Sequence, residues 1–511
     1  LSASNTYTGT TQVSAGTLTV SGSGRLSDST AVTVDNGATY NVAVSDTVAS
    51  IAGAGSITLG SNTLTSGGSN ANTTFSGVIS GTNGNIDKAG TGTLTLQGNN
   101  SYTGSTTISH ASGKIKIERD APLAYLGATS GFTGPGSLHV LPVSDDFSEA
   151  VSSANITLVG TWLNELVVGK AASSSTLYID SHIRTNGSQT YNGPTVVRNG
   201  NWELETSNDA ITFEDTLNSD GTPRNLTITN GSANLTLSGA VGGTNPLNNL
   251  TITTNVLTAG DIKVNDTLSV TNSGTSTISG VISNGATTAN LVKAGSGLLN
   301  LTGVSTYTGS TTISAGTLKV LNDNPTAYLA ATSGFTGPGN LTIESAGDNF
   351  TADIVTGTHV QLAGTALGNL IIGKAGNTRQ IDLSSNITTT NIQTYNGPVR
   401  LVGGDRTVAT TNSNVVFAST VNSDGTQRAL TVTNGNGDTT FSGAIGGSAP
   451  VKSLTITSDQ LTAGAITLNG ALTATLANAS TISGVIANGG GGTASLVKAG
   501  NGTLTLSASN T

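Results

Sequence analysis

The chain has 511 residues, but only 9% of them are charged and 4% are aromatic. Globular proteins carry about 25% charged residues, so this composition does not predict the surface of an ordinary soluble enzyme. The formal net charge is −9 and no basic stripe is visible, which argues against nucleic acid as a partner. Cys and Met are absent, so disulfides and thiolate metal sites are excluded.

Apolar residues occur only in short runs. No run approaches 18 consecutive apolar residues, so no membrane-spanning helix is predicted. The first residue is Leu1, with no Met and no signal peptide, and we expect the numbering to begin inside a longer mature protein.

The composition is typical of strands and turns. Gly (68 residues), Thr, Ser and Asn dominate, and the apolar residues are mainly Val, Ile, Leu and Ala. No segment has the apolar spacing of an amphipathic helix, so we expect almost no helix. Several segments alternate Leu, Ile or Val with Thr, which places aliphatic side chains on one face of a strand and Thr on the other. These segments are 226–229, 250–253, 430–433 and 454–457.

Two short elements recur along the chain. The first in chain order is Tyr-Thr-Gly, which begins at Tyr7, Tyr102 and Tyr307. The second is Lys-Ala-Gly-x-Gly, whose three lysines are equally spaced along the sequence. We interpret both the tyrosines and the lysines as structural repeat positions. The lysines are Lys88, Lys293 and Lys498.

A longer element recurs between them. Gly-Phe-Thr-Gly-Pro-Gly occurs twice, with Phe132 and Pro135 in the first copy and Phe335 and Pro338 in the second. We interpret these four residues as structural repeat positions as well, because they return at the same place in a duplicated segment.

The repeats divide the chain into four parts. We predict a short β-solenoid repeat unit at 1–95, long units at 96–300 and 301–505, and the start of the next unit at 506–511. Residues 506–511 are identical to the first six residues of the chain, from which we infer that the segment belongs to a tandem array.

A finer period lies within the long units. A Ser-Gly motif follows Leu237 and Ile278, and again Phe441 and Ile482, and the spacing within the two pairs is the same. If each pair spans two coils, this spacing predicts coils of about 20.5 residues, ten in each long unit and roughly 25 in the chain. At about 4.8 Å per coil, they would form a rod on the order of 120 Å long.

The predicted fold class is therefore all-β: a parallel β-helix or β-solenoid with roughly 20-residue coils, an elongated rod with essentially no α-helix. Inward Leu, Ile and Val would stack in ladders, each buried side chain contributing about 1.5 to 3 kcal/mol before entropy is counted. A row of antiparallel sandwiches would show similar short strands, but linkers should separate its compact units, and we see none.

Parts of the chain resemble known families of bacterial surface proteins. Residues 88–117, and residues 498–511 read on into 7–20, closely resemble the autotransporter-associated β-strand repeat, also called the passenger-associated transport repeat. The segments with Gln-Thr-Tyr-Asn-Gly-Pro at Gln189 and Gln393 resemble, more loosely, giant filamentous-haemagglutinin-like bacterial surface adhesins. The resemblance implies export through outer-membrane secretion machinery of a Gram-negative bacterium. It also implies an extracellular or cell-surface stalk that serves adhesion, biofilm or cell-surface architecture.

The best candidates for catalysis are Glu203 and Glu205, on one face of a predicted strand beside Trp202. Polysaccharide-active β-helices need two or three carboxylates gathered on one face. The corresponding positions in the second long unit are Thr407 and Ala409, so the pair is not duplicated with its surroundings. We therefore expect a solvated strand face and assign no catalytic residue.

Other candidate sites have simpler explanations. Asp145 and Asp146 could form a calcium-binding turn, but no nonapeptide array accompanies them, and we favour a plain Asx turn. Residues 368–374 have the spacing of a phosphate-binding loop, but Ala375 stands where the motif requires Ser or Thr. We predict no cofactor and no metal. Asp220 and Asp424 are interpreted as tight-turn residues, and isolated surface or loop positions are expected for His110, His139, His182 and His359.

Tyr102 and Tyr307 could stack on sugars, but their recurrence favours a structural corner or an internal ladder. The leading hypothesis is a non-enzymatic stalk or filament that self-associates along the rod or side by side and contacts other cells, polysaccharide or surfaces. Two alternatives stay open. One is ice or mineral-surface binding by outward pairs such as Thr227 and Thr229, and the other is a polysaccharide-active enzyme.

Overall fold

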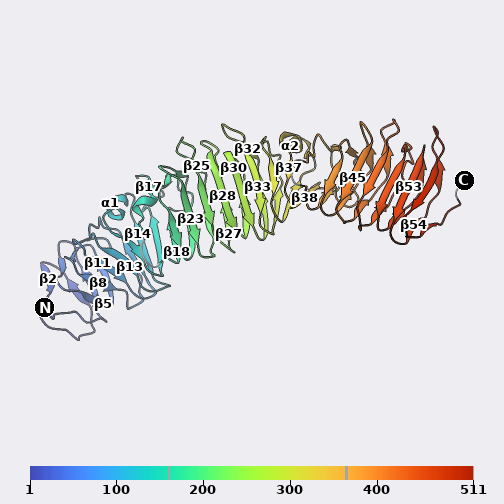
Figure 1. Ribbon diagram of the computed structural model, residues 1–511. Helices are drawn as coiled ribbons and strands as arrows, with labels where there is room; N and C mark the ends of the chain where they lie inside the picture. The colour runs from blue at the N-terminus through green and yellow to red at the C-terminus, as the bar shows by residue number, and fades with distance from the viewer. Residues whose placement is uncertain (159–161, 363–365, 510–511) are drawn as a thin grey trace. The chain divides into compact units, whose positions relative to one another are not determined.

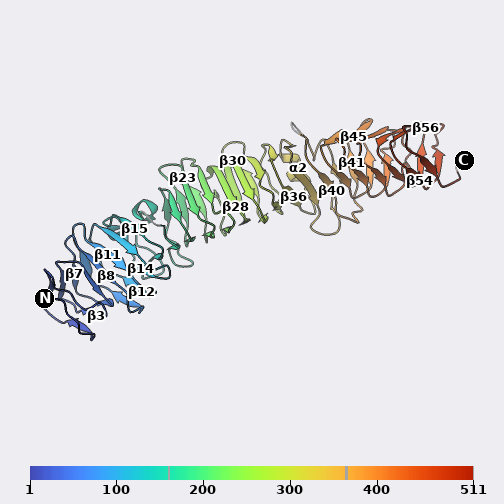
Figure 2. The ribbon, with the colours of Figure 1, turned by 60° about the horizontal axis from the view of Figure 1, so that its bottom comes forward.

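The computed structural model describes residues 1–158, 162–362 and 366–509. It consists of two compact units, Leu1–Gly260 and Asp261–Thr511, called the first unit and the second unit below. Within each unit, short strands of successive coils pair in parallel, one coil upon the next (Figures 1 and 2). The predicted parallel β-solenoid is therefore confirmed.

In the first unit, a complete coil passes through three ladders of parallel strands in turn. The longest ladder comprises β1 (Thr11–Val13), β3 (Ala31–Val34), β6 (Ser50–Gly53), β9 (Thr73–Phe75), β12 (Thr93–Leu96), β14 (Lys114–Glu118), β16 (Ser137–Leu141), β18 (Glu165–Val168), β21 (Ser188–Tyr191), β24 (Ile211–Phe213), β27 (Asn234–Leu237) and β29 (Val256–Ala259).

The other first-unit ladders are shorter. One set comprises β2 (Thr17–Val20), β4 (Thr39–Val42), β7 (Ser56–Thr58) and β10 (Val78–Ser80), followed along the chain by β17 (Val151–Ser152), β19 (Leu177–Ile179), β22 (Thr195–Val197) and β25 (Leu217–Ser219). The other comprises β5 (Asp46–Val48), β8 (Thr63–Ser66), β11 (Asn85–Lys88), β13 (Ser105–Ile108) and β15 (Gly131–Thr133), followed by β20 (Ile183–Thr185), β23 (Trp202–Thr206), β26 (Leu226–Thr229) and β28 (Leu247–Thr254).

The second unit is built in the same way. Its longest ladder comprises β31 (Thr275–Ile278), β34 (Leu298–Leu301), β36 (Thr317–Leu321), β38 (Asn340–Glu344), β40 (Leu370–Ile372), β43 (Gln393–Tyr395), β46 (Val415–Phe417), β49 (Thr439–Phe441), β51 (Leu461–Ala463), β54 (Ser480–Ile482) and β57 (Leu504–Leu506).

Four shorter groups complete the second unit. They are β30 (Ile262–Asn272), β32 (Ile282–Asn284), β33 (Asn290–Ala294), β35 (Thr311–Ile313) and β37 (Phe335–Thr336); β39 (Ile354–Val355), β41 (Ile381–Leu383), β44 (Val399–Leu401) and β47 (Val421–Ser423); β42 (Ile387–Thr389), β45 (Arg406–Thr410), β48 (Leu430–Thr433), β50 (Leu454–Ser458), β53 (Ala471–Leu476) and β56 (Ser495–Ala499); and β52 (Ile466–Leu468) with β55 (Ile486–Asn488).

The expectation of almost no helix is confirmed for the described residues. They contain α1 (Leu123–Leu126), α2 (Thr326–Ala331) and the 3₁₀ turn η1 (Ser153–Asn155). Each α-helix follows a proline and buries one Tyr and one Leu. These helices are too short to produce an amphipathic pattern, so the sequence could not reveal them.

The count of ten coils per long unit is wrong, because nine coils cover residues 301–506. The sequence estimate came from pairs such as Phe441 and Ile482, which span two of the shorter coils. Other coils carry longer corner loops, and the coil from Ile343 to Ile372 is the longest in this range. The described residues make about 22 coils. The nine coils are the nine steps between ten residues that stand in register in the longest ladder. These residues are Leu301, Val320, Ile343, Ile372, Tyr395, Phe417, Phe441, Ala463, Ile482 and Leu506.

The core consists of inward side chains stacked coil over coil. In β26, Leu226 and Ile228 are buried while the alternating Thr side chains are partly exposed. In the second unit, the rings of Tyr395, Phe417 and Phe441 stack with centroid separations of 5.1 and 4.8 Å. Period-two alternation thus separates a dry interior from a polar exterior, as predicted from the Leu-Thr-Ile-Thr segments.

The division at 95, 300 and 505 rests on sequence repeats and stays a prediction. The long units 96–300 and 301–505 are called the first module and the second module below. Of the predicted start of a further unit at 506–511, residues 510 and 511 lie outside the described residues.

Candidate functional surface

Two of the three repeat lysines lie in the core rather than on the surface. Lys88 and Lys293 are 1% and 0% exposed. The Lys293 ammonium donates to the carbonyls of Ala294 (2.7 Å) and Gly295 (2.9 Å), and to that of Ala315 in the next coil (3.3 Å). Burial lowers the pKa of Lys293 to about 8. Lys293 therefore ties two neighbouring corners together, because a buried ammonium must find oxygen partners.

Lys88 and Lys498 use the same carbonyls of their own motif. The Lys88 ammonium donates to the Ala89 carbonyl and to that of Gly90 (3.0 Å), and burial lowers its pKa. Lys498 is partly exposed, and its ammonium donates to the Gly500 carbonyl at 3.0 Å. The Lys-Ala-Gly sequence thus forms a local carbonyl cage in all three copies.

Each of the three repeat tyrosines makes the same kind of hydrogen bond. In each case the hydroxyl lies 2.6 Å from the hydroxyl of the Thr four residues later. Tyr102 and Tyr307 are fully buried and also bond the helical Tyr125 and Tyr328, whereas Tyr7 is 43% exposed. Tyr102 and Tyr307 therefore lie inside the coils and are not available as sugar-stacking platforms.

Phe132 and Phe335 are buried, and each follows one of the short helices along the chain. The rings of Phe132 and Tyr125 meet edge to face at 6.3 Å. Pro135 is partly exposed and Pro338 is exposed, each at a corner that follows a glycine with positive φ. These four residues shape the corner beneath α1 or α2, and none forms a reactive group.

Glu203 and Glu205 point outward from β23, as the alternation predicts. Glu205 pairs with Arg184 of the preceding coil (Nη2 to Oε1, 3.0 Å), and the Arg184 guanidinium lies 3.6 Å from the centre of the Trp162 ring. Next to these three side chains, the backbone N–H of Glu203 donates to Nδ1 of His182 (3.2 Å). Sequence reasoning missed Trp162 and Arg184, because they lie about 40 and 20 residues before Glu205 and only coil stacking brings the three together.

Trp202 has a structural role at a corner of the coil. Its indole N–H donates to the Arg198 carbonyl (2.6 Å), and its ring lies over Gly200. In the second module, Arg406 takes this place and donates to the carbonyl of Val402. Because two different side chains satisfy the same carbonyl position, this site selects for a long N–H donor rather than for an aromatic ring.

Asp146 is a hydrogen-bond acceptor for the neighbouring coil. Its carboxylate accepts hydrogen bonds from the backbone N–H of Ser174 (2.6 Å) and from the hydroxyls of Ser173 and Ser174. These bonds lower the pKa of Asp146, and the bond from the Ser174 hydroxyl is the largest cause. These bonds join one coil to the next, so the expected local Asx turn is corrected to a bond between coils. In the second module, the neutral Asn349 accepts from Thr378 in the same way, so this role requires no cation.

The Ser-Asp-Gly-Thr segments form the predicted turns. Asp220 accepts from the N–H of Thr222 and pairs with Arg224, and Asp424 does the same with Thr426 and Arg428. The hydrogen bond from Arg428 lowers the pKa of Asp424 to about 2. Each aspartate thus fixes its own turn.

The histidines do not converge. His110, His182 and His359 each accept a backbone N–H. His139, however, lies on β16 with its Nε2 2.8 Å from Glu165, so the expectation of an isolated residue is wrong there. Burial lowers its pKa despite the neighbouring carboxylate. Among the described residues, no group of three or more His, Asp or Glu could hold a metal ion.

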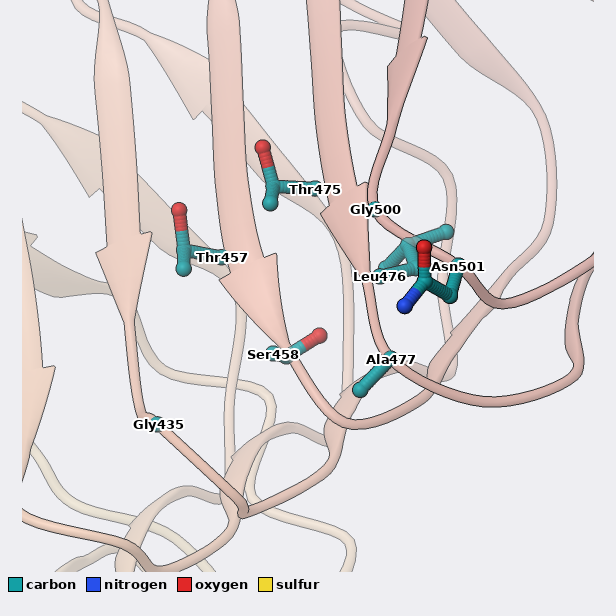
Figure 3. A pocket seen from close by; sticks show the side chains of 8 residues that line it. All are labelled: Gly435, Thr457, Ser458, Thr475, Leu476, Ala477, Gly500 and Asn501. Atoms are coloured by element: carbon teal, nitrogen blue, oxygen red, sulfur yellow. The ribbon is translucent and has the colours of Figure 1, made fainter.

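The remaining candidates show no catalytic arrangement. Leu370 and Ile372 are buried in β40, so the stretch ending at Lys374 is a core strand rather than a phosphate-binding loop. A hollow in the second unit is lined by uncharged side chains, with Thr457 and Thr475 on neighbouring strands (Figure 3). Within the described part of the chain, no helix has the length and apolarity to cross a membrane.

Comparison with known proteins agrees with this architecture. A family model described as Passenger-associated-transport-repeat matches residues 1–20, 86–111, 291–320 and 496–511, which contain the repeat lysines and tyrosines. The Adhesin BmaC autotransporter of Brucella suis biovar 1 (strain 1330) is 28% identical over 301 residues, 49% of this chain and 8% of that protein. The chain thus corresponds to a small part of this relative. No solved structure matches the chain.

Two of the matched segments, 86–111 and 291–320, contain the buried Tyr102 and Tyr307, whose hydroxyl groups bond a tyrosine of the next coil. The chain is a parallel β-solenoid with four segments that match the passenger-associated transport repeat, and it is similar to part of an autotransporter adhesin.

Proposed function

We propose that this chain is a non-enzymatic stalk segment of an adhesin on the surface of, or secreted by, a Gram-negative bacterium. The observation that supports it is duplication of the inward framework without duplication of the outward glutamate pair that was the best catalytic candidate. Glu203 and Glu205 are replaced by Thr407 and Ala409, while Tyr191 and Tyr395 keep the same buried bonds to Gln189 and Gln393. A stalk needs the first property and not the second.

The proposal also covers the larger surface protein to which this segment would belong. That protein would be exported by outer-membrane machinery, would self-associate along or beside the stalk, and would serve attachment or biofilm formation. Latex beads coated with the purified chain should adhere to bacterial or host cells, and electron microscopy of the native material should show extended particles. Beads that adhere no better than beads coated with albumin, together with compact particles, would contradict the proposal.

A second candidate, binding to ice or a mineral surface, is favoured by one observation. Two parallel columns of outward threonines run over three successive coils of the second unit, and Figure 3 shows one threonine from each of two neighbouring strands. A thermal-hysteresis measurement on the purified chain tests it, and absence of activity removes it. The columns are Thr431, Thr455 and Thr473, and Thr433, Thr457 and Thr475.

A further inference from the structure

We propose that an outward strip on the first unit binds a neutral glycan chain. The strip is defined by Trp162, His182, Arg184, Glu203 and Glu205. This inference deepens the proposed adhesive function and rests on it, because it names the site and the class of ligand through which the stalk would attach.

The strip is ordered by coil stacking. Trp162, Arg184 and Glu205 follow one another on three successive coils, joined by the 3.6 Å cation–π contact and the 3.0 Å ion pair. The register of β20 with β23 places Arg184 directly beside Glu205. Arg184 and Glu205 thus stand on neighbouring strands about 4.8 Å apart, and the Trp162 ring lies against the guanidinium.

The same line continues over outward hydroxyls. Glu203 and Glu205 of β23 stand in register with Thr227 and Thr229 of β26, and these in turn with Thr251 and Thr253 of β28. A linear polymer lying along the axis would therefore meet a polar side chain at every coil. Globular ligands would use only one or two of these rows.

The groups of the strip remain accessible for hydrogen bonds. The side chains of Arg184 and Glu205 are 48% and 30% exposed. His182 is exposed, and because its Nδ1 accepts the backbone N–H of Glu203, the neutral ring carries its proton on Nε2. Donors, carboxylate acceptors and an aromatic side chain lie together, which suits a sugar ring with hydroxyls at its edge and C–H groups on its face.

The charge of the strip selects among glycans. One guanidinium and two carboxylates give a net charge of about −1 with His182 neutral, on a chain whose own net charge is −9. Acidic polysaccharides would be repelled, so the strip favours a neutral chain.

The fold does not require these groups. In the second module, the corresponding residues are Ala366, Asn386, Thr388, Thr407 and Ala409, and β42 and β45 pair there in the same register as β20 and β23. The coil framework therefore forms without the aromatic ring, the guanidinium or the carboxylates. This leaves ligand binding as the role that distinguishes the first module.

The test measures the binding of cellohexaose, laminarihexaose and maltohexaose to the full chain. Isothermal titration calorimetry and tryptophan fluorescence are the two methods. The chain has two tryptophans, one in the strip and the other beside it, so bound sugar should change the emission. We expect saturable binding of at least one of these neutral hexasaccharides and none of hexagalacturonate. Failure of all three to bind, or tighter binding of hexagalacturonate, overturns the inference.

A matched variant exchanges three residues of the strip for their counterparts in the second module. Trp162→Ala, Arg184→Thr and Glu205→Ala, combined, should weaken binding at least about tenfold while circular dichroism stays unchanged. If the combined variant does not fold, the single variant Arg184→Thr replaces it in the binding measurement. The control is Asn386→Ala combined with Thr407→Ala, which should bind as the original chain does. Equal binding by the strip variant overturns the inference.

Coated beads separate the two proposals. If the original chain adheres and the strip variant adheres equally well, the glycan strip is wrong and the adhesive function stands. If neither adheres, the adhesive function itself fails.

Discussion

The first module and the second module keep the same interior and differ on the exterior. Tyr191 and Tyr395 donate to the side chains of Gln189 and Gln393 in both copies, at 2.9 and 2.7 Å. The outward strip of charged and aromatic residues, in contrast, exists only in the first module. In a solenoid, an inward side chain must fit the coils on both sides, whereas an outward side chain must only avoid disrupting its strand. The interior is thus constrained by packing, and the exterior is free to acquire binding functions.

The largest expected effect comes from the aromatic stack, which differs slightly between the modules. Phe417 stacks on both Tyr395 and Phe441, while Phe213 stacks on Tyr191 and is followed in the next coil by Leu237. Phe417→Ala should lower the local free energy of unfolding by about 3 to 5 kcal/mol, and Phe213→Ala by somewhat less.

Hydrogen exchange of the flanking strands measures both losses. The outward Val416→Thr is the matched control and should change exchange little. A larger effect of Phe213→Ala than of Phe417→Ala would show that the additional ring contact does not stabilise the second module.

The next effect concerns the buried lysines and depends on pH. Burial lowers the pKa of Lys293 from 10.5 to about 8, so between these values the unfolded chain binds more protons than the folded chain. The contribution of Lys293 to stability should therefore rise as pH rises from about 8 to 10.5, by at most on the order of 3 kcal/mol. Urea unfolding across this range measures the slope.

Lys293→Met should reduce this rise, and Lys88→Met should do so as well, because burial also lowers the pKa of Lys88. Comparison with the original chain cancels the titration of the other groups. An unchanged slope in both variants would mean that neither lysine loses its proton more easily on folding.

A smaller effect tests a corner common to both modules. Gly134 and Gly337 have φ values of +104° and +100°, and a Cβ there would lie 2.4 and 2.6 Å from the carbonyl oxygens of Ile108 and Ile313. Gly134→Ala and Gly337→Ala should each cost about 1 to 3 kcal/mol, measured by chemical denaturation. Gly243→Ala is the control, because its nearest neighbour would lie at 3.6 Å. A neutral result at either corner would contradict the described backbone.

Removal of one buried hydroxyl should have nearly the same effect in each module. Tyr191→Phe and Tyr395→Phe each leave the Oε1 atom of a buried Gln without its donor, at a cost of about 1 kcal/mol. Thermal unfolding of the two variants in parallel measures the difference. A cost in one module only would show that the interiors are less alike than their hydrogen bonds indicate.

The smallest effect comes from exchanging equivalent acceptors. Asp146→Asn introduces the residue found at Asn349, and it should leave the midpoint of unfolding almost unchanged. Addition of calcium should not shift the melting temperature of either form. A calcium-dependent stabilisation that Asp146→Asn abolishes would instead identify a cation site.

Much of the fold could be predicted from residues that alternate. Leu226 and Ile228 are buried and Thr227 and Thr229 are outward because a strand with period two has no other way to hide its aliphatic side chains. The lysine cage could not be predicted, since nothing in Lys-Ala-Gly indicates that its ammonium turns inward to carbonyl oxygens. The coil length was also underestimated, because corner loops vary from coil to coil without disturbing the paired strands.

The sequence by itself determined the parallel solenoid, its duplicated modules and its resemblance to passenger-associated transport repeats, because these depend on local alternation and on repetition. Only the tertiary structure decided which distant residues share a surface. Trp162, Arg184 and Glu205 come together because stacked coils convert a separation of about 20 residues into a contact, and that conversion depends on the actual length of every coil between them.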